Sequence, residues 1–237
     1  MSDLSKSPTR IAPMFDAIAA RYDFLNHFLS AGIDRGWRRE AIRSLKLTGS
    51  EHMVDVCTGT GDLAIAAARA AGGAARVTGV DFAGAMLRVG VEKIERQPLA
   101  SRIGFVRGDA TRIPIVSAWA HALTGGFGMR NVENMPAAFA EFHRVLAAGG
   151  RLAILEFAMP PNPVVRTGYR WYSKHVMPRI GRLVSRHGEA YGYLPESIDA
   201  FSPPAEIVKL LRHAGFTNAA ARPLTFGIVY LYTGIRD

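Results

Sequence analysis

The chain has 237 residues, 49% hydrophobic and 21% charged, which is typical of a globular protein long enough to bury a full core. Its net charge of +9 predicts an anionic partner: nucleic acid, an acidic substrate or an anionic membrane surface. The single cysteine, Cys57, excludes a disulfide framework and a cysteine-based metal site, and we expect it to be a small buried side chain in a strand.

Neither a targeting segment nor a membrane span is predicted. Residues 1–11 are polar and contain Pro8, so they lack the apolar centre of a signal peptide. The longest uncharged stretch, 113–129, is interrupted by proline, serine, histidine and glycine, whereas a spanning helix needs about 20 mostly apolar residues. We therefore expect a cytoplasmic protein, or one at the inner face of the membrane.

The chain before the first strand is predicted to be helical. Apolar residues recur at the spacing of one helix face, as in Phe15, Ile18 and Tyr22. Ala31 and Gly32 break the pattern, and a second helix is expected over 34–45 with Asp34 as its N-cap. We expect residues 1–47 to form a helical cap over the site.

Strands and helices then alternate, which predicts an α/β fold with a doubly wound, mostly parallel, seven-stranded sheet. The expected strands are 52–57, 76–81, 103–107, 118–124, 150–157, 218–223 and 227–235. The expected helices are 62–71, 84–97, 136–146 and 205–214. The last two strands are expected to form a hairpin at the sheet edge. Residues 48–237 would form this domain, interrupted at about 160–203 by a helical insertion that begins with several prolines.

A glycine turn follows the first predicted strand. Gly59 and Gly61 allow a ligand to approach the backbone, and Asp81 ends the next strand at the spacing of an acid that binds ribose hydroxyls. The glycines alone also fit any tight turn. Asp55 and Asp62 would repel a pyrophosphate and attract a cation, so the pattern favours S-adenosylmethionine over a dinucleotide.

The loops at the carboxyl ends of parallel strands meet at one crevice. Asp109, after the third strand, is therefore a candidate for the adenine amino group, although it equally suits a turn cap. No metal site is predicted, because the seven histidines have no ligand spacing.

Several blocks, in order along residues 14–236, resemble the ubiquinone/menaquinone biosynthesis C-methyltransferase family, a class I S-adenosylmethionine-dependent group with a Rossmann-like fold. These blocks are 22–26, the glycine turn, 79–82 with 86–87, 127–132, 141–156, 190–198 and 224–229. The resemblance assigns cofactor contacts to Thr60, Asp81, Asp109 and Ala110. The chain departs from the family pattern at Ala120-His121 and at Gly126, where a serine that contacts the cofactor is common.

The resemblance implies methylation of a ring carbon on a polyprenyl quinol, either demethylmenaquinol or a ubiquinone precursor. Arg130 is the candidate cation that lowers the pKa of a ring hydroxyl, with Asn131 orienting the ring oxygens and Tyr22 holding the hydroxyl. Arg130 pairing with a carboxylate and Tyr22 packing in the core are the alternatives. No residue stands out as a general base.

Residues 164–186 hold six Lys or Arg and no acid, with Trp171 and Tyr172 interleaved. Arg166, Arg170 and Lys174 share one helix face, and Arg179, Arg182 and Arg186 follow. This segment is either a solvated basic face or a contact with anionic lipid headgroups, where long-tailed quinols reside. Methylation of another small molecule on the same fold, and RNA binding by the basic surface, are the alternative functions; the oligomeric state is not predicted.

Overall fold

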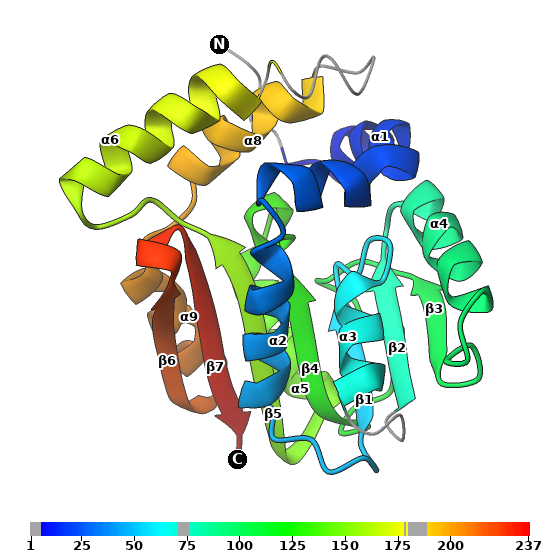
Figure 1. Cartoon of the computed structure of the whole chain (residues 1–237). Coiled ribbons are helices and arrows are strands. Elements are labelled where there is room, and N and C mark those ends of the chain that lie inside the picture. The colour runs from blue at the N-terminus through cyan, green and yellow to red at the C-terminus, as the bar shows by residue number, and fades with distance from the viewer. Residues whose placement is uncertain (1–5, 71–75, 178, 180–188) are drawn as a thin grey trace.

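A seven-stranded sheet forms the centre of the computed structural model, which describes residues 6–70, 76–177, 179 and 189–237 (Figure 1). The strands are β1 (His52–Val56), β2 (Arg76–Asp81), β3 (Ile103–Arg107), β4 (Ala120–Gly126), β5 (Leu146–Phe157), β6 (Phe216–Leu224) and β7 (Val229–Arg236). They lie in the order β3-β2-β1-β4-β5-β7-β6. The predicted doubly wound α/β sheet is confirmed.

The direction of the strands places the site. Strands β1 to β5 are parallel, whereas β7 runs antiparallel between β5 and the edge strand β6, which confirms the predicted hairpin. The chain order reverses beside β1, which pairs with β2 on one side and β4 on the other. Ligands bind such sheets at the carboxyl ends of the strands, at this reversal.

Helices cover both faces of the sheet. Helices α2 (Asp34–Ser44) and α3 (Asp62–Ala70) pack in front of the sheet as Figure 1 is viewed, and α4 (Gly84–Glu95) contributes Ile94 to the same apolar cluster. Helices α5 (Met135–Val145) and α9 (Pro204–His213) cover the other face. The two apolar clusters bury the sheet on both sides, as its run of apolar strand residues requires.

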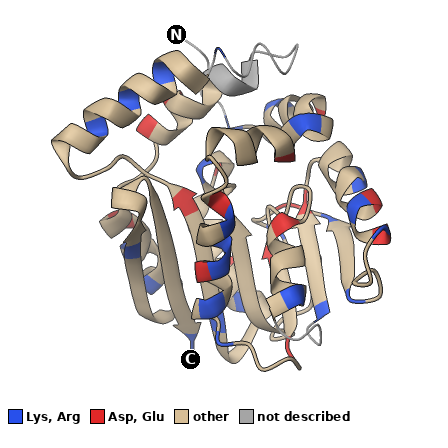
Figure 2. Ribbon diagram, viewed as in Figure 1, with Lys and Arg blue, Asp and Glu red and all other residues tan. Residues whose placement is uncertain are grey.

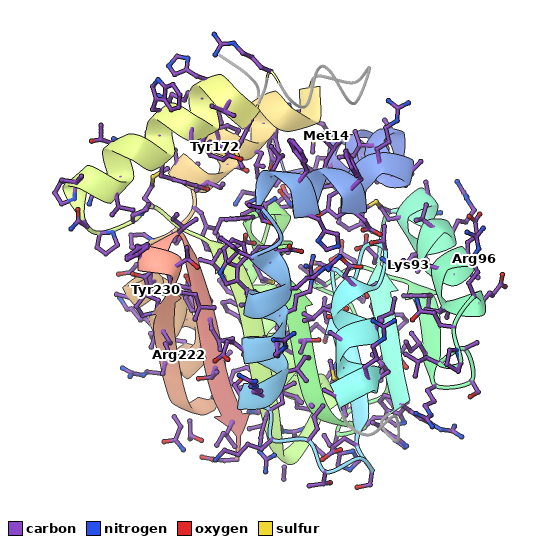
Figure 3. All side chains as sticks on the ribbon, in the orientation of Figure 1. Met14, Lys93, Arg96, Tyr172, Arg222 and Tyr230 are labelled. Carbon is purple, nitrogen blue, oxygen red and sulfur yellow. The ribbon has the colours of Figure 1, made fainter. Side chains whose placement is uncertain are left out.

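A second group of helices lies over the carboxyl ends of the parallel strands (Figure 1). It consists of α1 (Pro8–Leu29), α6 (Pro163–Trp171) with its continuation η2 (Tyr172–Val176), and α8 (Glu189–Asp199). The hydroxyl of Tyr172 donates to the carbonyl of Leu29 at 2.7 Å and links the insertion to α1; Figure 3 shows Tyr172 between these helices. We call α1, α6, η2 and α8 the cap.

Three expectations differ from this structure. Only α1 of the N-terminal helices lies in the cap, because α2 buries Trp37, Ala41 and Ile42 against the sheet side of the domain. Asp34 is the first residue of α2 and not its N-cap, which is Ile33; its carboxylate instead accepts a hydrogen bond from Ser30 and pairs with Arg38. Helix α8 was not predicted as a separate element.

The basic residues predicted to face a membrane are only partly described. Helix α6 begins at Pro163, with Asn162 as its N-cap, and carries the expected row of basic residues (Figure 2). Arg182 and Arg186 lie outside the described residues. No described helix is both long and apolar enough to cross a membrane.

Candidate active site

Two hollows lie at the carboxyl ends of β1, β2 and β4, and they share Phe82 and Asn131. We call them together the strand-end cleft. Its wall includes Cys57, Gly59, Asp81, Phe82, Asp109, Ala110, Gly126, Gly128 and Asn131. The structure therefore brings together four of the predicted cofactor residues, namely Gly59, Asp81, Asp109 and Ala110.

Asp81 is held rigidly at the centre of this cleft. One carboxylate oxygen accepts a hydrogen bond from the backbone N–H of Gly59 at 2.8 Å, and the other accepts one from Ala83 at 2.9 Å. Burial raises the pKa of Asp81, an effect that these two hydrogen bonds oppose. Each oxygen keeps lone-pair capacity for a further donor, such as a ribose hydroxyl.

The turn that supports Asp81 needs its glycines. Gly59 and Gly61 have φ values of 56° and 80°, in the left-handed region, and a Cβ on Gly61 would lie 2.6 Å from the ring of Phe105. Cys57 is also left-handed, with φ of 53°; it is half-buried and lines the cleft just beyond β1, not within the strand as expected. Burial raises the pKa of its thiol well above the ordinary value, so the thiol is neutral.

Asp55, Thr60 and Asp62 do not line the cleft. Asp55 is fully buried below the turn, where its two oxygens accept hydrogen bonds from the hydroxyls of Thr58 and Thr124. Burial raises the pKa of Asp55 to about 6. Asp55 therefore organises the turn from below and does not line the cleft in which its cofactor contact was expected.

Thr60 and Asp62 instead join the turn to the helices around it. The Thr60 hydroxyl donates to Asp23 of α1, and Lys93 of α4 forms ion pairs with Asp23 at 2.6 Å and with Asp62 at 2.5 Å. Asp62 also pairs with Arg38 at 3.2 Å. The charge of Asp62 is thus compensated within the protein, and the expected attraction of a cationic ligand is left chiefly to Asp81.

The carboxylate charges of a cluster that could bind a metal ion are compensated in the same way. His27, Asp34 and Asp62 offer ligand atoms within 4.8 Å of one another. Arg38 forms ion pairs with both carboxylates, and His27 lies 2.6 Å from Asp34. This cluster is an ion-pair network between α1, α2 and α3.

Asp109 serves two purposes that the sequence left open. One of its oxygens accepts hydrogen bonds from the backbone and the hydroxyl of Thr111, at 2.7 and 2.6 Å, as a turn cap does. Asp109 and Ala110 also line the part of the cleft beyond Phe82. This turn therefore places Asp109 at the end of the cleft that lies away from Gly59.

The family departures lie at opposite ends of the sheet. His121 accepts a hydrogen bond from the backbone N–H of His52, at the start of β1, so Ala120-His121 is remote from the cleft. Gly126 lines the cleft, where a Cβ would meet the side chain of Leu63 at an ordinary 3.4 Å. Only the Gly126 departure affects the site.

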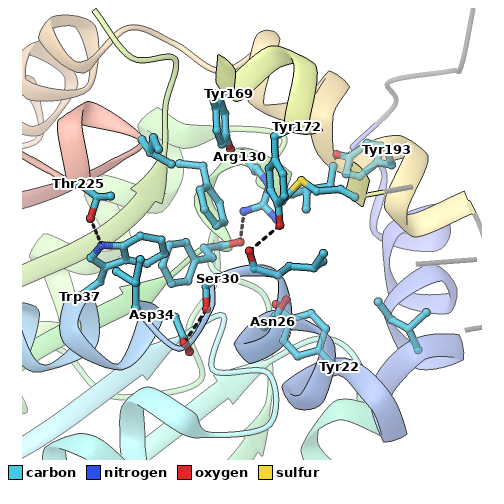
Figure 4. Close-up of a pocket in the computed structure, with 18 of the residues that line it drawn as sticks. Tyr22, Asn26, Ser30, Asp34, Trp37, Arg130, Tyr169, Tyr172, Tyr193 and Thr225 are labelled. Carbon is cyan, nitrogen blue, oxygen red and sulfur yellow. Dashed lines mark hydrogen bonds between the residues drawn. The ribbon is translucent and has the colours of Figure 1, made fainter. Parts of the chain in front are cut away.

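Beneath the cap lies a largely apolar cavity of about 190 Å³, which we call the cap cavity (Figure 4). Its wall comes from α1, α2, α6, η2, α8, the end of β5 and the loops after α1, β4 and β6, and includes Phe15, Tyr22, Asn26, Trp37, Phe127, Arg130, Phe157, Tyr169, Tyr172, Tyr193 and Thr225. Phe15, Tyr22 and Phe127 line both this cavity and the strand-end cleft. The two spaces therefore adjoin through these three side chains.

Arg130 is the buried cation of the cap cavity. It lies in the 3₁₀ turn η1 (Met129–Asn131), and its Nη1 pairs with Glu156 at 2.8 Å and donates to the carbonyl of Phe127. Its Nε donates to Ser197 of α8 at 3.3 Å. Among the described residues Nη2 has no hydrogen-bond partner, which leaves this group for a ligand. Arg130 thus pairs with a carboxylate, as the predicted alternative states, and also lines the cap cavity.

Glu156 was not predicted, yet it holds Arg130 in place. Its side chain is fully buried at the end of β5 and accepts hydrogen bonds from the backbone N–H groups of Arg130 and Phe157, at 3.0 and 2.8 Å. A charged residue at the end of the apolar run 152–155 was the signal that could have identified it. Five hydrogen bonds hold the side chains of Arg130 and Glu156 in place.

The electrostatic effect of Arg130 is visible on the tyrosines around it. Burial raises the pKa of Tyr22, Tyr169 and Tyr193, and the positive charge of Arg130 opposes this rise in all three. The hydroxyl of Tyr169 is buried and has no hydrogen-bond partner in the described part of the chain. A phenolic hydroxyl of a ligand in the same space would experience both effects: burial would raise its pKa, and the charge of Arg130 would oppose that rise.

Asn131 does not accompany Arg130 into the cap cavity. Its side chain lines the strand-end cleft from the opposite side of η1, and its buried Oδ1 has no described partner. The expected role of orienting ring oxygens therefore does not fit this placement. One 3₁₀ turn presents Arg130 to one space and Asn131 to the other.

Residues 3–236 match the ubiE/COQ5 methyltransferase family. The chain belongs to this family. It is 46% identical over 225 residues to the "Ubiquinone/menaquinone biosynthesis C-methyltransferase UbiE" of Syntrophotalea carbinolica, covering 95% of this chain and 93% of that one. It is 41% identical over 236 residues to the "Demethylmenaquinone methyltransferase" of Bacteroides fragilis, covering 99% and 96%. As a member of the ubiE/COQ5 family it is a methyltransferase.

The fold agrees with this membership. A solved structure of a SAM-dependent methyltransferase from Aquifex aeolicus superposes with a TM-score of 0.64, at 14% identity, over 84% of this chain and 89% of that one. At this identity the likeness shows the fold alone. The Rossmann-like fold of this ubiE/COQ5 family member is thus shared beyond its close relatives.

Proposed function

We propose that this methyltransferase transfers a methyl group from S-adenosylmethionine to a ring carbon of a polyprenyl quinol, demethylmenaquinol or the equivalent ubiquinone precursor. The observation that carries the proposal is the common wall of Phe15, Tyr22 and Phe127 between the cap cavity and the strand-end cleft. A methyl donor in one space and a ring in the other would meet there. The names of the two relatives support a quinone-type methyl acceptor.

The polar side chains that line the strand-end cleft fit S-adenosylmethionine. Asp81 would accept hydrogen bonds from the ribose hydroxyls, and Asp109 with Ala110 would bind the adenine end. The unpartnered Oδ1 of Asn131, between them, is an acceptor for an N–H or O–H group of the ligand. The described wall carries three acidic side chains, Asp81, Asp109 and Glu133, and one basic side chain, Lys6, so the ligand meets a net negative environment, which suits a sulfonium and opposes a pyrophosphate.

When bound, S-adenosylmethionine supplies a methyl group that its sulfonium already activates, so the protein mainly aligns the acceptor carbon. The carbon becomes nucleophilic when a neighbouring hydroxyl loses its proton. At a pKa of roughly 10, only about one phenolic hydroxyl in a thousand is ionised at pH 7. An adjacent cation lowers such a pKa by about 1–3 units.

Arg130 would supply this stabilisation through its unpartnered Nη2, because Glu156 and the Phe127 carbonyl hold Nη1 in position. Tyr22, on the common wall, would hold the ring against the methyl donor. The ring carbon gains the methyl group and loses its own proton, and the ring oxygen regains a proton, so that S-adenosylhomocysteine and one proton are released per turnover. The aromatic wall of the cavity excludes water from this exchange.

The acceptor class is tested with labelled methyl donor and three acceptors: a demethylated naphthoquinol, a benzoquinol precursor that lacks the ring methyl group, and total RNA. Release of S-adenosylhomocysteine with a quinol, and label in the ring, is the expected result. Methylation of neither quinol would favour the alternative of another small molecule, and label in RNA would favour the RNA alternative. The ratio of kcat/KM for the two quinols decides between menaquinone and ubiquinone precursors.

We also propose peripheral contact with an anionic membrane through the α6–η2 segment. The support is uneven among its three aligned basic residues. Arg166 donates to the carbonyls of Pro160 and Pro161, and Arg170 lies 3.5 Å from Asp199. Lys174 is exposed and makes no ion pair with a described residue. Charge alone therefore offers less attraction than the sequence suggested, and other features must contribute.

A further inference from the structure

The exposed Phe and Trp side chains of the described residues lie on elements that contribute to the wall of the cap cavity. Among the described residues, the exposed Phe and Trp side chains all lie on α1, α6 and the turn η3 (Thr225–Gly227); they are Phe24, Phe28, Trp171 and Phe226. The large exposed apolar side chains on α4, on β3 and before β4 are valines: Val91, Val106 and Val116. Exposed aromatic groups on one side of a protein mark a surface that contacts a partner or a membrane.

Three exposed apolar side chains belong to the wall of the cap cavity or adjoin a wall residue in the chain, and we call them the apolar rim: Ile33, Trp171 and Phe226. Ile33 lines the cavity and is nevertheless 48% exposed, so the cavity reaches the surface beside it. Trp171 and Phe226 are 62% and 79% exposed, and each is next in the chain to a residue of the cavity wall, Tyr172 and Thr225. The α1–α2 loop, α6 and η3 thus each contribute one member.

The structure holds Phe226 outward. Thr225 and Phe226 have φ values of 44° and 58°, a left-handed conformation that such residues rarely adopt. The Thr225 hydroxyl accepts a hydrogen bond from Trp37 Nε1 at 2.8 Å, and Gly227 packs so closely on Pro161 that a Cβ would lie 2.7 Å away. The contacts on both sides keep the turn in this conformation with its aromatic ring in solvent.

We infer that the apolar rim inserts into a lipid bilayer and that the prenyl tail of the substrate passes between its side chains. This inference rests on the proposed function. The cap cavity, at about 190 Å³, is smaller than the roughly 300–1,000 Å³ of pockets for drug-sized ligands, so it accepts the ring and leaves a long tail outside. Trp and Phe are suited to the interfacial region, and the exposed Arg170 and Lys174 lie on the same helical segment as Trp171.

The test replaces Phe226 by Asn and Trp171 by Gln in one double variant. Asparagine tolerates the left-handed backbone at position 226, so the fold should be retained and the melting temperature should not fall. The matched control is Val116→Asn, which removes an apolar group that is 69% exposed in the loop before β4. Co-sedimentation measures binding to phosphatidylcholine vesicles containing anionic lipid, at low salt and at about 0.5 M salt, where charge attraction is screened.

The double variant should bind vesicles at least tenfold more weakly at both salt concentrations, and Val116→Asn should bind as the wild type does. The kcat/KM of the double variant for a long-tailed quinol in vesicles should fall by a similar factor, while the double variant should methylate a short-tailed, water-soluble quinol normally. Unchanged vesicle binding of a folded double variant would overturn the inference, as would wild-type binding that disappears at high salt. Absence of methylation of any quinol by the wild type would instead overturn the proposed function.

Discussion

The buried pair of Arg130 and Glu156 determines how the role of Arg130 must be tested. Replacing Arg130 alone leaves the fully buried Glu156 carboxylate without its cation, which typically costs about 3–5 kcal/mol of the free energy of unfolding. A loss of turnover in Arg130→Gln would therefore mix unfolding with chemistry. The double variant Arg130→Gln, Glu156→Gln removes both charges and keeps similar volumes, and we expect it to recover most of this stability.

The two effects then separate. A cation that lowers the pKa of the ring hydroxyl by about 1–3 units raises its ionised fraction about 10- to 1,000-fold at pH 7. We expect the double variant to lose turnover by a factor in this range while its affinity for S-adenosylmethionine, measured by calorimetry, stays near that of the wild type. The deficit should shrink about tenfold per pH unit once the pH exceeds the lowered pKa of the hydroxyl in the wild type, about 7 to 9, because only the hydroxyl in the variant then continues to ionise. Full turnover at pH 7 in the folded double variant would refute the oxyanion role.

Three further predictions concern the turn and its supports. Asp81→Ala should weaken S-adenosylmethionine binding in calorimetry at least several-fold, because each hydrogen bond to a charged group contributes about 1.5–3 kcal/mol; unchanged affinity would remove Asp81 from the site. Asp55 has a pKa of about 6 in the folded state, above its unfolded value, so the native protein binds the extra proton and loses stability as the pH rises from about 4 to about 6. Asp55→Asn should abolish this loss, of about 3 kcal/mol, in urea unfolding measured across that range, and an identical pH profile would contradict the assignment. Asp23→Asn removes the contacts of α1 with Thr60 and Lys93, so it should raise the KM for quinol and the hydrogen-exchange rates of α1 amides. Asp62 still pairs with Lys93 in this variant and preserves the fold. Unchanged exchange rates would mean that other contacts hold α1.

The parts of the fold that depend on local pattern were predictable. The strand β1, the glycine turn and Asp81 follow from apolar runs and glycine positions, since adjacent residues decide those conformations. The edge hairpin of β6 and β7 was predicted for the same reason. Helix α8 was not, because Gly192 and Pro195 lower its intrinsic helix propensity and packing in the cap must compensate.

The errors in the site share a different cause. Asp34 has the sequence of an N-cap, but its carboxylate bonds instead to the side chains four residues away on either side, Ser30 and Arg38. Arg130 and Asn131 are neighbours in sequence, and only the 3₁₀ turn shows that they face different spaces. Glu156 is brought to Arg130 from 26 positions away. Side-chain direction and long-range pairing are set by tertiary packing, which a linear pattern does not contain.

The wall shared by Phe15, Tyr22 and Phe127 has a consequence for the design of inhibitors. The strand-end cleft belongs to a fold that many methyltransferases share, so a nucleoside analogue alone would discriminate poorly among them. A molecule that joins such an analogue to an aromatic ring, through a linker short enough to pass this wall, would occupy both spaces at once. Linking makes the second contact intramolecular and gains affinity without new contacts, while the ring takes its selectivity from the cap.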